Sequence, residues 1–231
     1  MDIEFAWDDN KLYILQCRSL SMRREAERVP LPANVPEEDT LFRTGSGITN
    51  ARITNIEYVV YVDPRAYDRL DTVEKKHKVG RTVGRLNKRL AGKQYALMGP
   101  GRWGSNDINL GVRVTYADIN STRLLVEIAF ARDGYTPEVS YGTHFFQDLV
   151  EADIAIMPLY PDTPGSMLKE DFLLGSHNSL CELEPGAVDM RDAVHVLHIP
   201  SLRDGKLLHV LLDGESQRGM GMFGPAAPQQ R

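Results

Sequence analysis

The first twenty residues alternate polar and apolar positions in two short runs. The runs are residues 2–7, DIEFAW, and residues 12–15, LYIL, and the turn-forming segment DDNK lies between them. Such alternation is typical of β-strands with one buried face, and the short polar connection indicates a hairpin. We therefore expect an N-terminal β-hairpin over residues 1–20, with Phe5 and Leu15 buried. Because two strands alone cannot bury a face, the hairpin must pack on something else.

After residue 20 the pattern predicts a linker, a folded domain and a tail. Residues 21–47 are polar and then rich in proline and glycine, as linkers are. Helical and strand patterns are mixed in residues 48–213 without strict alternation. We therefore predict an α+β fold there, a mixed β-sheet with packed helices. Residues 214–231 are rich in Gly, Gln, Pro and Met and predict a flexible tail.

Several elements within this domain bear on candidate sites. Apolar residues at intervals of three and four predict a long helix after Asp63-Pro64, and Gly80 and Gly84 are the positions that could interrupt it. The shorter predicted elements are a strand at 112–116, a helix at 143–150 and a closing hairpin formed by 193–199 and 206–212.

Composition narrows the class of protein. The chain has 231 residues, a formal net charge of −5 and 42% hydrophobic residues, which is ordinary for a soluble globular protein. No apolar run reaches the roughly 18 to 20 residues that span a bilayer, so we expect no membrane partner. The N-terminus lacks the basic and apolar regions of a signal peptide. Cys17 and Cys181 make neither a disulfide framework nor a zinc site, so we expect a cytoplasmic protein.

The two N-terminal runs carry a family resemblance. DIEF at 2–5 and LYILQCR at 12–18 resemble the end of the ATP-grasp nucleotide-binding domain of phosphoenolpyruvate synthase and pyruvate phosphate dikinase. The resemblance implies that Glu4 binds magnesium and nucleotide. It also implies that Gln16 and Arg18 bind the nucleotide at its transferring phosphoryl group, with Arg18 catalytic. Phosphoryl transfer requires such groups, a carboxylate for the metal and a guanidinium for the developing charge.

This resemblance implies a C-terminal portion of a dikinase-like, ATP-dependent phosphotransferase. The intact parent protein would use ATP and magnesium, and the partner of this chain would be the upstream ATP-grasp region of the same parent. The sequence contains no counterpart of the family's adenine pocket, phosphohistidine signature or phosphoenolpyruvate barrel. We therefore expect the isolated chain to be inactive and to bind no cofactor tightly. The segments GPGRWGS at 99–105 and GTHFF at 142–146 carry a further resemblance. Through them, about residues 45–160 resemble a region that follows the ATP-grasp domain in phosphoenolpyruvate synthase-like proteins, a resemblance that implies no role.

A glycine motif gives a second candidate site. Residues 99–104 match G-x-G-x-x-G, but the residues that follow have turn composition, which argues against a dinucleotide-binding helix. An anion-binding loop is the functional interpretation, and a turn that packs Trp103 is the structural one. The proposed anion-binding residues are Arg102 and Ser105 in the loop, and Thr143 and His144 at a helix N-terminus. A small anionic ligand would then make the chain a non-enzymatic sensing or docking module.

For three further patterns we favour a structural interpretation over a functional one. The run of Lys and Arg between 75 and 93 lacks interleaved aromatic residues, so nucleic acid is only a second alternative and is not expected as a partner. Glu127 lies inside an apolar strand and is either paired with an Arg or functional. His195, His198 and His209 suggest a metal site, but His195 and His198 point to opposite faces of a predicted strand and cannot share a metal without a bulge, so we reject this site.

Overall fold

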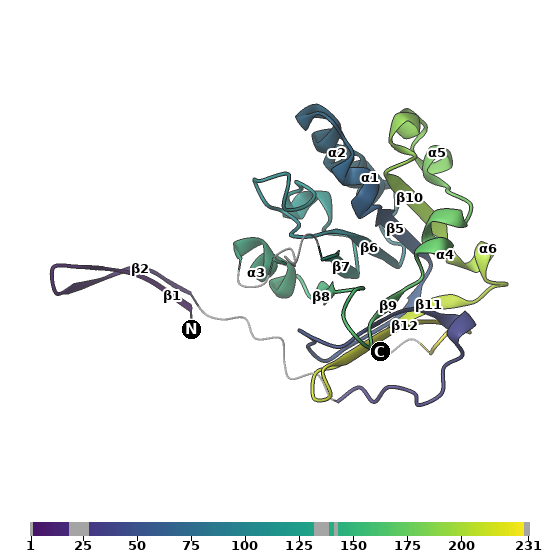
Figure 1. The fold of residues 1–231 in the computed structure, drawn as a ribbon, viewed down its shortest axis with the longest axis horizontal. Helices are drawn as coiled ribbons and strands as arrows, with labels where there is room; N and C mark the ends of the chain where they lie inside the picture. Colours follow the sequence, from purple (N-terminus) through teal and green to yellow (C-terminus); the bar gives the residue numbers. More distant parts are fainter. Residues whose placement is uncertain (1, 19–27, 132–138, 141–142, 229–231) are drawn as a thin grey trace.

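The protein has two five-stranded sheets, a layer of helices and a separate two-stranded hairpin (Figure 1). The computed structural model describes residues 2–18, 28–131, 139–140 and 143–228. Mixed sheets packed with helices, preceded by an N-terminal hairpin, confirm the predicted α+β class. The order of layers in Figure 1 is helices, first sheet, second sheet.

The first sheet has the strand order β10-β5-β6-β7-β8. Its strands are β5 (Tyr58–Val62), β6 (Tyr95–Pro100), β7 (Leu124–Ile128), β8 (Ala155–Leu159) and β10 (Val194–His198). The strands from β5 to β8 run parallel, and β10 pairs antiparallel with β5. Every residue of β6, β7 and β8 is buried, as expected for a parallel sheet covered on both faces.

The second sheet is antiparallel and corrects the predicted domain boundaries. Its order is β4 (Ala51–Ile56), β11 (Leu207–Asp213), β12 (Arg218–Gly224), β3 (Thr40–Thr44) and β9 (Met167–Leu168). β3 lies in the predicted linker and β12 in the predicted tail, so both boundaries are wrong. The glycines that made residues 214–231 resemble a tail have a packing role. A Cβ at Gly221 would lie 2.5 Å from the ring of Phe42 on β3.

Short helices and one long helix connect these strands. The α-helices are α1 (Pro64–Asp68), α2 (Val73–Arg89), α3 (His144–Glu151), α4 (Glu170–Gly175), α5 (Leu180–Leu183) and α6 (Ile199–Leu202). The 3-10 helices are η1 (Glu37–Asp39), η2 (Tyr116–Asp118) and η3 (Pro185–Met190). Within the described residues, none of these helices combines the length and the apolar character needed to cross a membrane.

Other local predictions have mixed outcomes. The predicted helix at 143–150 is confirmed as α3, and the Thr143 hydroxyl caps it by accepting from the amide of Phe146. The predicted helix after Asp63 is divided into α1 and α2, because Thr72 caps the start of α2. The predicted strand at 112–116 is not a strand. The predicted closing hairpin is wrong, since β10 and β11 belong to different sheets.

The alternation of side chains along the parallel strands divides the core in two. Val60 and Val62 of β5 face the helices, whereas Val59 and Tyr61 face the second sheet. The first core therefore fills the space between the parallel sheet and the helices, and the second fills the space between the two sheets. Both faces of the parallel sheet are buried, so a polar side chain on either face avoids a free-energy cost only with a partner within the protein.

Two glycines on α2 allow the chain after β6 to lie close against this helix. Gly80 and Gly84 do not interrupt α2, which runs unbroken for 17 residues. A Cβ at Gly80 would lie 2.2 Å from the carbonyl oxygen of Arg113, and one at Gly84 would lie 2.6 Å from a carboxylate oxygen of Asp118. The two glycines therefore form the surface on which residues 113–118 rest.

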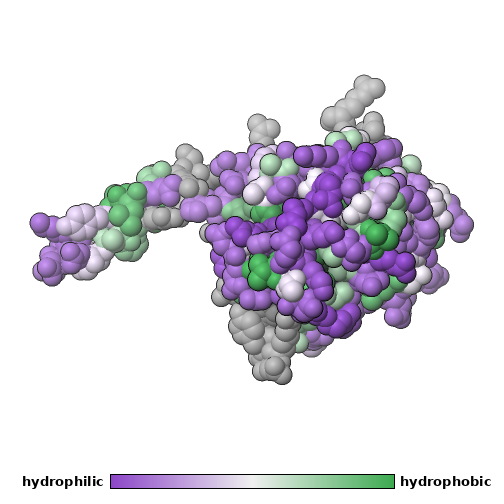
Figure 2. Space-filling model, turned by 90° about the horizontal axis from the view of Figure 1, so that it is seen from above, coloured by the Kyte–Doolittle hydropathy of each residue, from purple (hydrophilic) through white to green (hydrophobic). Residues whose placement is uncertain are grey.

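The N-terminal hairpin forms as predicted but lacks the predicted burial. β1 (Asp2–Asp8) pairs antiparallel with β2 (Lys11–Arg18). Phe5 and Leu15 are 62% and 66% exposed, so the prediction that they are buried is wrong. Figure 2 shows a hydrophobic band across the middle of the hairpin, which projects from the body. The described part of this chain supplies no cover for it.

Because the Arg113 backbone lies so close to Gly80, one added methyl group at this position should destabilise the protein more than the same change at an unconstrained helical glycine. We expect Gly80→Ala to lower the free energy of unfolding by about 1 to 3 kcal/mol, because the Arg113 backbone must move. Gly175→Ala is the matched control, since Gly175 is also helical but has no atom within 4 Å of its Cβ position. Urea denaturation measures both. Equal effects of the two substitutions would contradict the close packing.

Candidate functional site

Glu127 is a buried carboxylate that joins three segments of the chain. It lies on β7 and is 1% exposed. One carboxylate oxygen accepts from the amide of Trp103 at 3.1 Å, and the other accepts from the amide of Ser140 at 2.7 Å. Trp103 belongs to the loop after β6, and Ser140 belongs to the segment that precedes α3. A single side chain therefore ties this loop and this segment to the end of β7.

The environment of Glu127 changes its acidity. Burial raises the pKa of its carboxyl group to about 7, against the opposing effects of the hydrogen bonds from Ser140 and Trp103 and of the Arg102 charge. The sequence left two interpretations open, an Arg pair or a functional acid. The structure gives Glu127 backbone amides as its hydrogen-bond donors and places the charge of Arg102 near enough to lower its pKa.

The glycine loop uses its own amides for contacts within the protein. The amide of Gly101 donates to Ile128, that of Arg102 to Leu110 and that of Gly104 to Val112. The remaining amide, of Trp103, donates to Glu127. The group that this loop binds through its backbone is thus the protein's own Glu127 carboxyl group, and the Trp103 side chain is buried. Any external anion here would have to be held by side chains.

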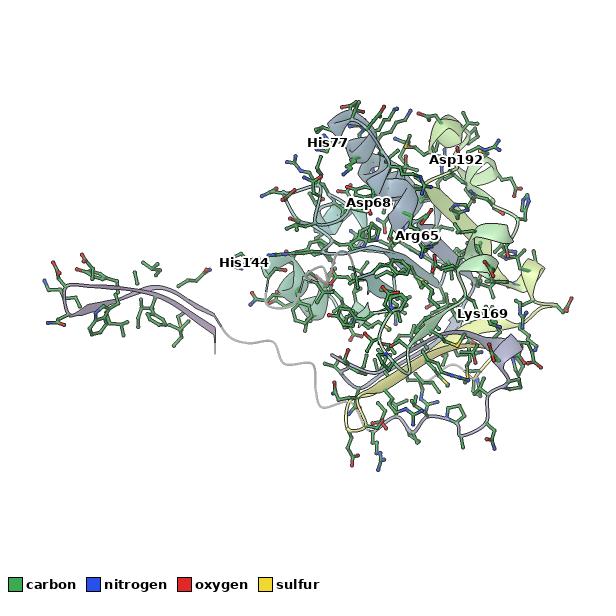
Figure 3. All side chains as sticks on the ribbon, in the orientation of Figure 1. Arg65, Asp68, His77, His144, Lys169 and Asp192 are labelled. Atoms are coloured by element: carbon green, nitrogen blue, oxygen red, sulfur yellow. The ribbon has the colours of Figure 1, made fainter. Side chains whose placement is uncertain are left out.

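The four proposed anion-binding residues lie on two segments that meet. Arg102 is half-buried, and the Ser105 hydroxyl accepts from the amide of Asp107 at 3.1 Å. The Thr143 hydroxyl is occupied as the cap of α3, and His144 is exposed at the start of that helix (Figure 3). That these four residues together bind an anion stays a prediction.

Gly104 brings the loop and α3 together. A Cβ on this residue would lie 2.5 Å from the Phe145 ring, and its φ of +71° is in the left-handed region that favours glycine. The loop and the first turn of α3 therefore pack directly against each other. The side chains that surround the adjoining pocket are different from the four that the sequence indicated.

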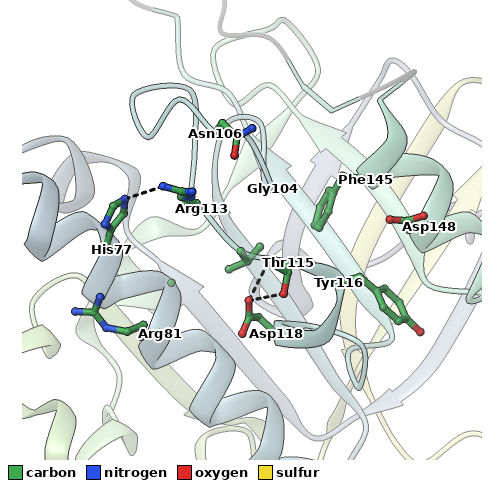
Figure 4. Close-up of a pocket in the computed structure, with 12 residues that line it drawn as sticks. His77, Arg81, Gly104, Asn106, Arg113, Thr115, Tyr116, Asp118, Phe145 and Asp148 are labelled. Carbon is green, nitrogen blue, oxygen red and sulfur yellow. Dashed lines mark hydrogen bonds between the residues drawn. The ribbon is translucent and has the colours of Figure 1, made fainter.

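This pocket has a volume of about 500 Å³ and lies between α2, residues 104–118 and α3 (Figure 4). The polar and aromatic side chains on its wall are His77, Arg81, Asn106, Arg113, Thr115, Tyr116, Asp118, Phe145 and Asp148. The sequence alone did not indicate this pocket because these residues come from three separate segments. The available signal was the four-residue spacing of Gly80 and Gly84, which indicates a helix face that another segment can approach.

The hairpin register bears on the candidate nucleotide-binding residues. Glu4 pairs with Gln16, and Asp2 pairs with Arg18. A bulge in this register leaves Leu15 without a partner on β1. Positions 4, 16 and 18 consequently share one side of the hairpin. The side chains of Glu4 and Arg18 lie outside those that the structure describes, so their contacts are not assigned.

The basic run at 75–93 forms many ion pairs with acids elsewhere in the chain. The pairs are Lys75–Asp71, Lys78–Asp189, Arg81–Glu74, Arg85–Glu184, Arg89–Glu184 and Lys93–Glu57. These contacts neutralise much of the positive charge on α2 and weaken the case for a nucleic-acid surface. Over the residues that the structure describes, no group of three or more His, Cys, Asp or Glu side chains could hold a metal ion.

Comparisons of the chain with protein-family models, curated proteins and solved structures found no match.

Glu127 predicts a pH-dependent stability. Because the folded-state pKa is raised from 4.5 to about 7, the proton on Glu127 favours the folded state, and this stabilisation is lost as the pH rises towards 7. The Glu127→Gln variant has no titrating group at this position, so its stability should lack this dependence on pH. We expect the stability of the wild type relative to the variant to fall by about 2 to 3 kcal/mol between about pH 5 and pH 8.

Urea denaturation across this pH range measures the effect. Glu37→Gln serves as the control because Glu37 is exposed and should leave the pH profile unchanged. A stability difference between Glu127→Gln and the wild type that does not vary with pH would contradict the raised pKa.

Proposed function

We propose that this chain is the C-terminal portion of an ATP-dependent phosphotransferase like phosphoenolpyruvate synthase and pyruvate phosphate dikinase. In this proposal the hairpin completes an ATP-grasp nucleotide-binding domain whose other part is the upstream region of the parent chain. The observation that carries it is the uncovered apolar side of the hairpin. The apolar residues concerned are Ile3, Phe5, Trp7, Leu12 and Ile14, each between 45% and 65% exposed.

The two sides of the hairpin differ in chemistry. Phe5 pairs with Ile14 and Trp7 pairs with Leu12, so these four positions share one side. The other side carries the pair Glu4–Gln16 and the position of Arg18. Such a hairpin is marginal alone and is stabilised when its apolar side packs on a larger domain.

In this arrangement the polar side of the hairpin faces the bound nucleotide. A carboxylate at Glu4 suits a magnesium ion that bridges nucleotide phosphates. Gln16 and Arg18 offer hydrogen-bond donors to the transferring phosphoryl group, and the guanidinium can meet two phosphate oxygens at once. ATP and magnesium are thus the proposed cofactors of the intact protein. A cytoplasmic location belongs to the same proposal and agrees with the two free cysteines, Cys17 and Cys181.

The proposal makes a prediction for the intact protein. The DNA upstream of the Met1 codon should encode an ATP-grasp region in frame. In the protein expressed with that region, Arg18→Ala should lower ATP-dependent phosphoryl transfer by about 10³-fold or more, because the developing phosphoryl charge loses its guanidinium. Arg123→Ala, at the start of β7, is the control and should leave the rate unchanged. An unrelated upstream sequence, or a full rate in Arg18→Ala, would refute the proposal.

A second prediction concerns the chain by itself. Without the adenine pocket that the upstream region supplies, it should release no phosphate from magnesium-ATP above the level of Glu4→Ala. A coupled phosphate assay at high protein concentration measures this. Release that depends on both magnesium and Glu4 would show that the chain contains a complete catalytic site.

A further inference from the structure

We infer that the 500 Å³ pocket between α2, residues 104–118 and α3 binds a nucleotide, a ligand with a phosphate group attached to a flat, ring-bearing part. This inference goes beyond the proposed function, which uses the hairpin alone. The pocket volume falls within the range of about 300 to 1,000 Å³ that is usual for small-molecule sites. Figure 4 shows basic side chains on one side of the pocket and aromatic ones on the other.

The basic side of the pocket suits a phosphate. It is formed by His77 and Arg81 of α2 and by Arg113, which Gly80 allows to lie against this helix. Nη1 of Arg113 lies 3.4 Å from Nε2 of His77. Because a guanidinium only donates hydrogen bonds, that ring nitrogen is the acceptor, and this contact leaves the positive charge of Arg113 in place.

Arg81 can also turn towards a ligand. Its guanidinium pairs with Glu74 at 2.5 Å, and the two side chains are 51% and 75% exposed. An ion pair this exposed contributes little to stability, so a phosphate can replace the carboxylate at small cost. Two guanidinium groups near one site favour phosphate because each can donate two parallel hydrogen bonds.

The opposite side of the pocket suits the flat ring of a ligand and the polar groups attached to it. Tyr116 is 37% exposed, and Phe145 is half-buried with its ring against Gly104. Aromatic rings bind a flat base by stacking. Asn106 and Asp148 are exposed on the pocket wall and can bond to sugar hydroxyls or to an exocyclic amine. An acid on this side disfavours a second phosphate group there, which orients the ligand.

Contacts within the protein position the walls of the pocket. The carboxylate of Asp118 accepts from the amide and the hydroxyl of Thr115, at 2.8 and 2.7 Å. Its other oxygen lies against Gly84, and Phe145 lies against Gly104. Close packing of this kind limits the ordering cost of binding.

Isothermal titration calorimetry of the full chain tests the inference, with ADP, inorganic phosphate and adenosine as separate probes and no magnesium. We expect ADP to bind more tightly than either of the other two. Arg113→Ala should weaken ADP and phosphate by about tenfold or more, because a charge-assisted contact is lost. Tyr116→Ala should weaken ADP and leave phosphate unchanged. Arg123→Ala is the matched control and should bind ADP like the wild type.

The outcomes separate this site from the hairpin. ADP binding that persists in Arg18→Ala and is lost in Arg113→Ala supports the pocket. Binding that is lost in Arg18→Ala and kept in Arg113→Ala would overturn the inference and leave the proposed function standing. Equal affinities for ADP and phosphate would overturn the nucleotide assignment, as would the absence of ADP binding. Thermal unfolding of each variant confirms that it is folded.

Discussion

Burial of the parallel sheet on both faces is the constraint on which the rest of this structure depends. Helices cover one face and the antiparallel sheet covers the other, so a polar side chain within these strands avoids a free-energy cost only by finding partners inside the protein. Glu127 is such a side chain, and it meets the requirement with the amides of Trp103 and Ser140. These two hydrogen bonds offset part of the cost of burying the carboxyl group, and they fix the positions of Trp103 and Ser140 beside β7.

The position of the glycine loop follows from this contact. With the Trp103 amide held by Glu127, Gly104 meets Phe145 on α3, and the chain continues to Arg113 against Gly80 on α2. The pocket lies between these two contacts. The candidate chemistry of the protein is thus divided between two places, a hairpin whose apolar side is uncovered and a pocket on the folded body. The two sites share no residues and can be tested separately.

Local patterns predicted the elements that local interactions determine. The hairpin follows from alternation over residues 2–15. The start of α3 follows from Thr143, whose hydroxyl accepts a hydrogen bond from the amide three residues later. Local patterns failed where distant segments decide the structure. Glycines in β12 suggested a tail because the Phe42 ring that fills the space beside Gly221 lies far away in sequence. The pocket was missed for the same reason, since His77, Arg113 and Phe145 are brought together only by the fold.

The central claim is that the Glu127 carboxylate holds the glycine loop and the segment before α3. Amide ¹H–¹⁵N NMR spectra of the full chain across about pH 4 to 9 test it directly, because an amide shift reports the ionisation of the carboxylate that it contacts. The account predicts that the amides of Trp103 and Ser140 titrate together with a midpoint of about 7. Midpoints near 4.5, the ordinary value for Glu, or amides that do not titrate, would contradict it.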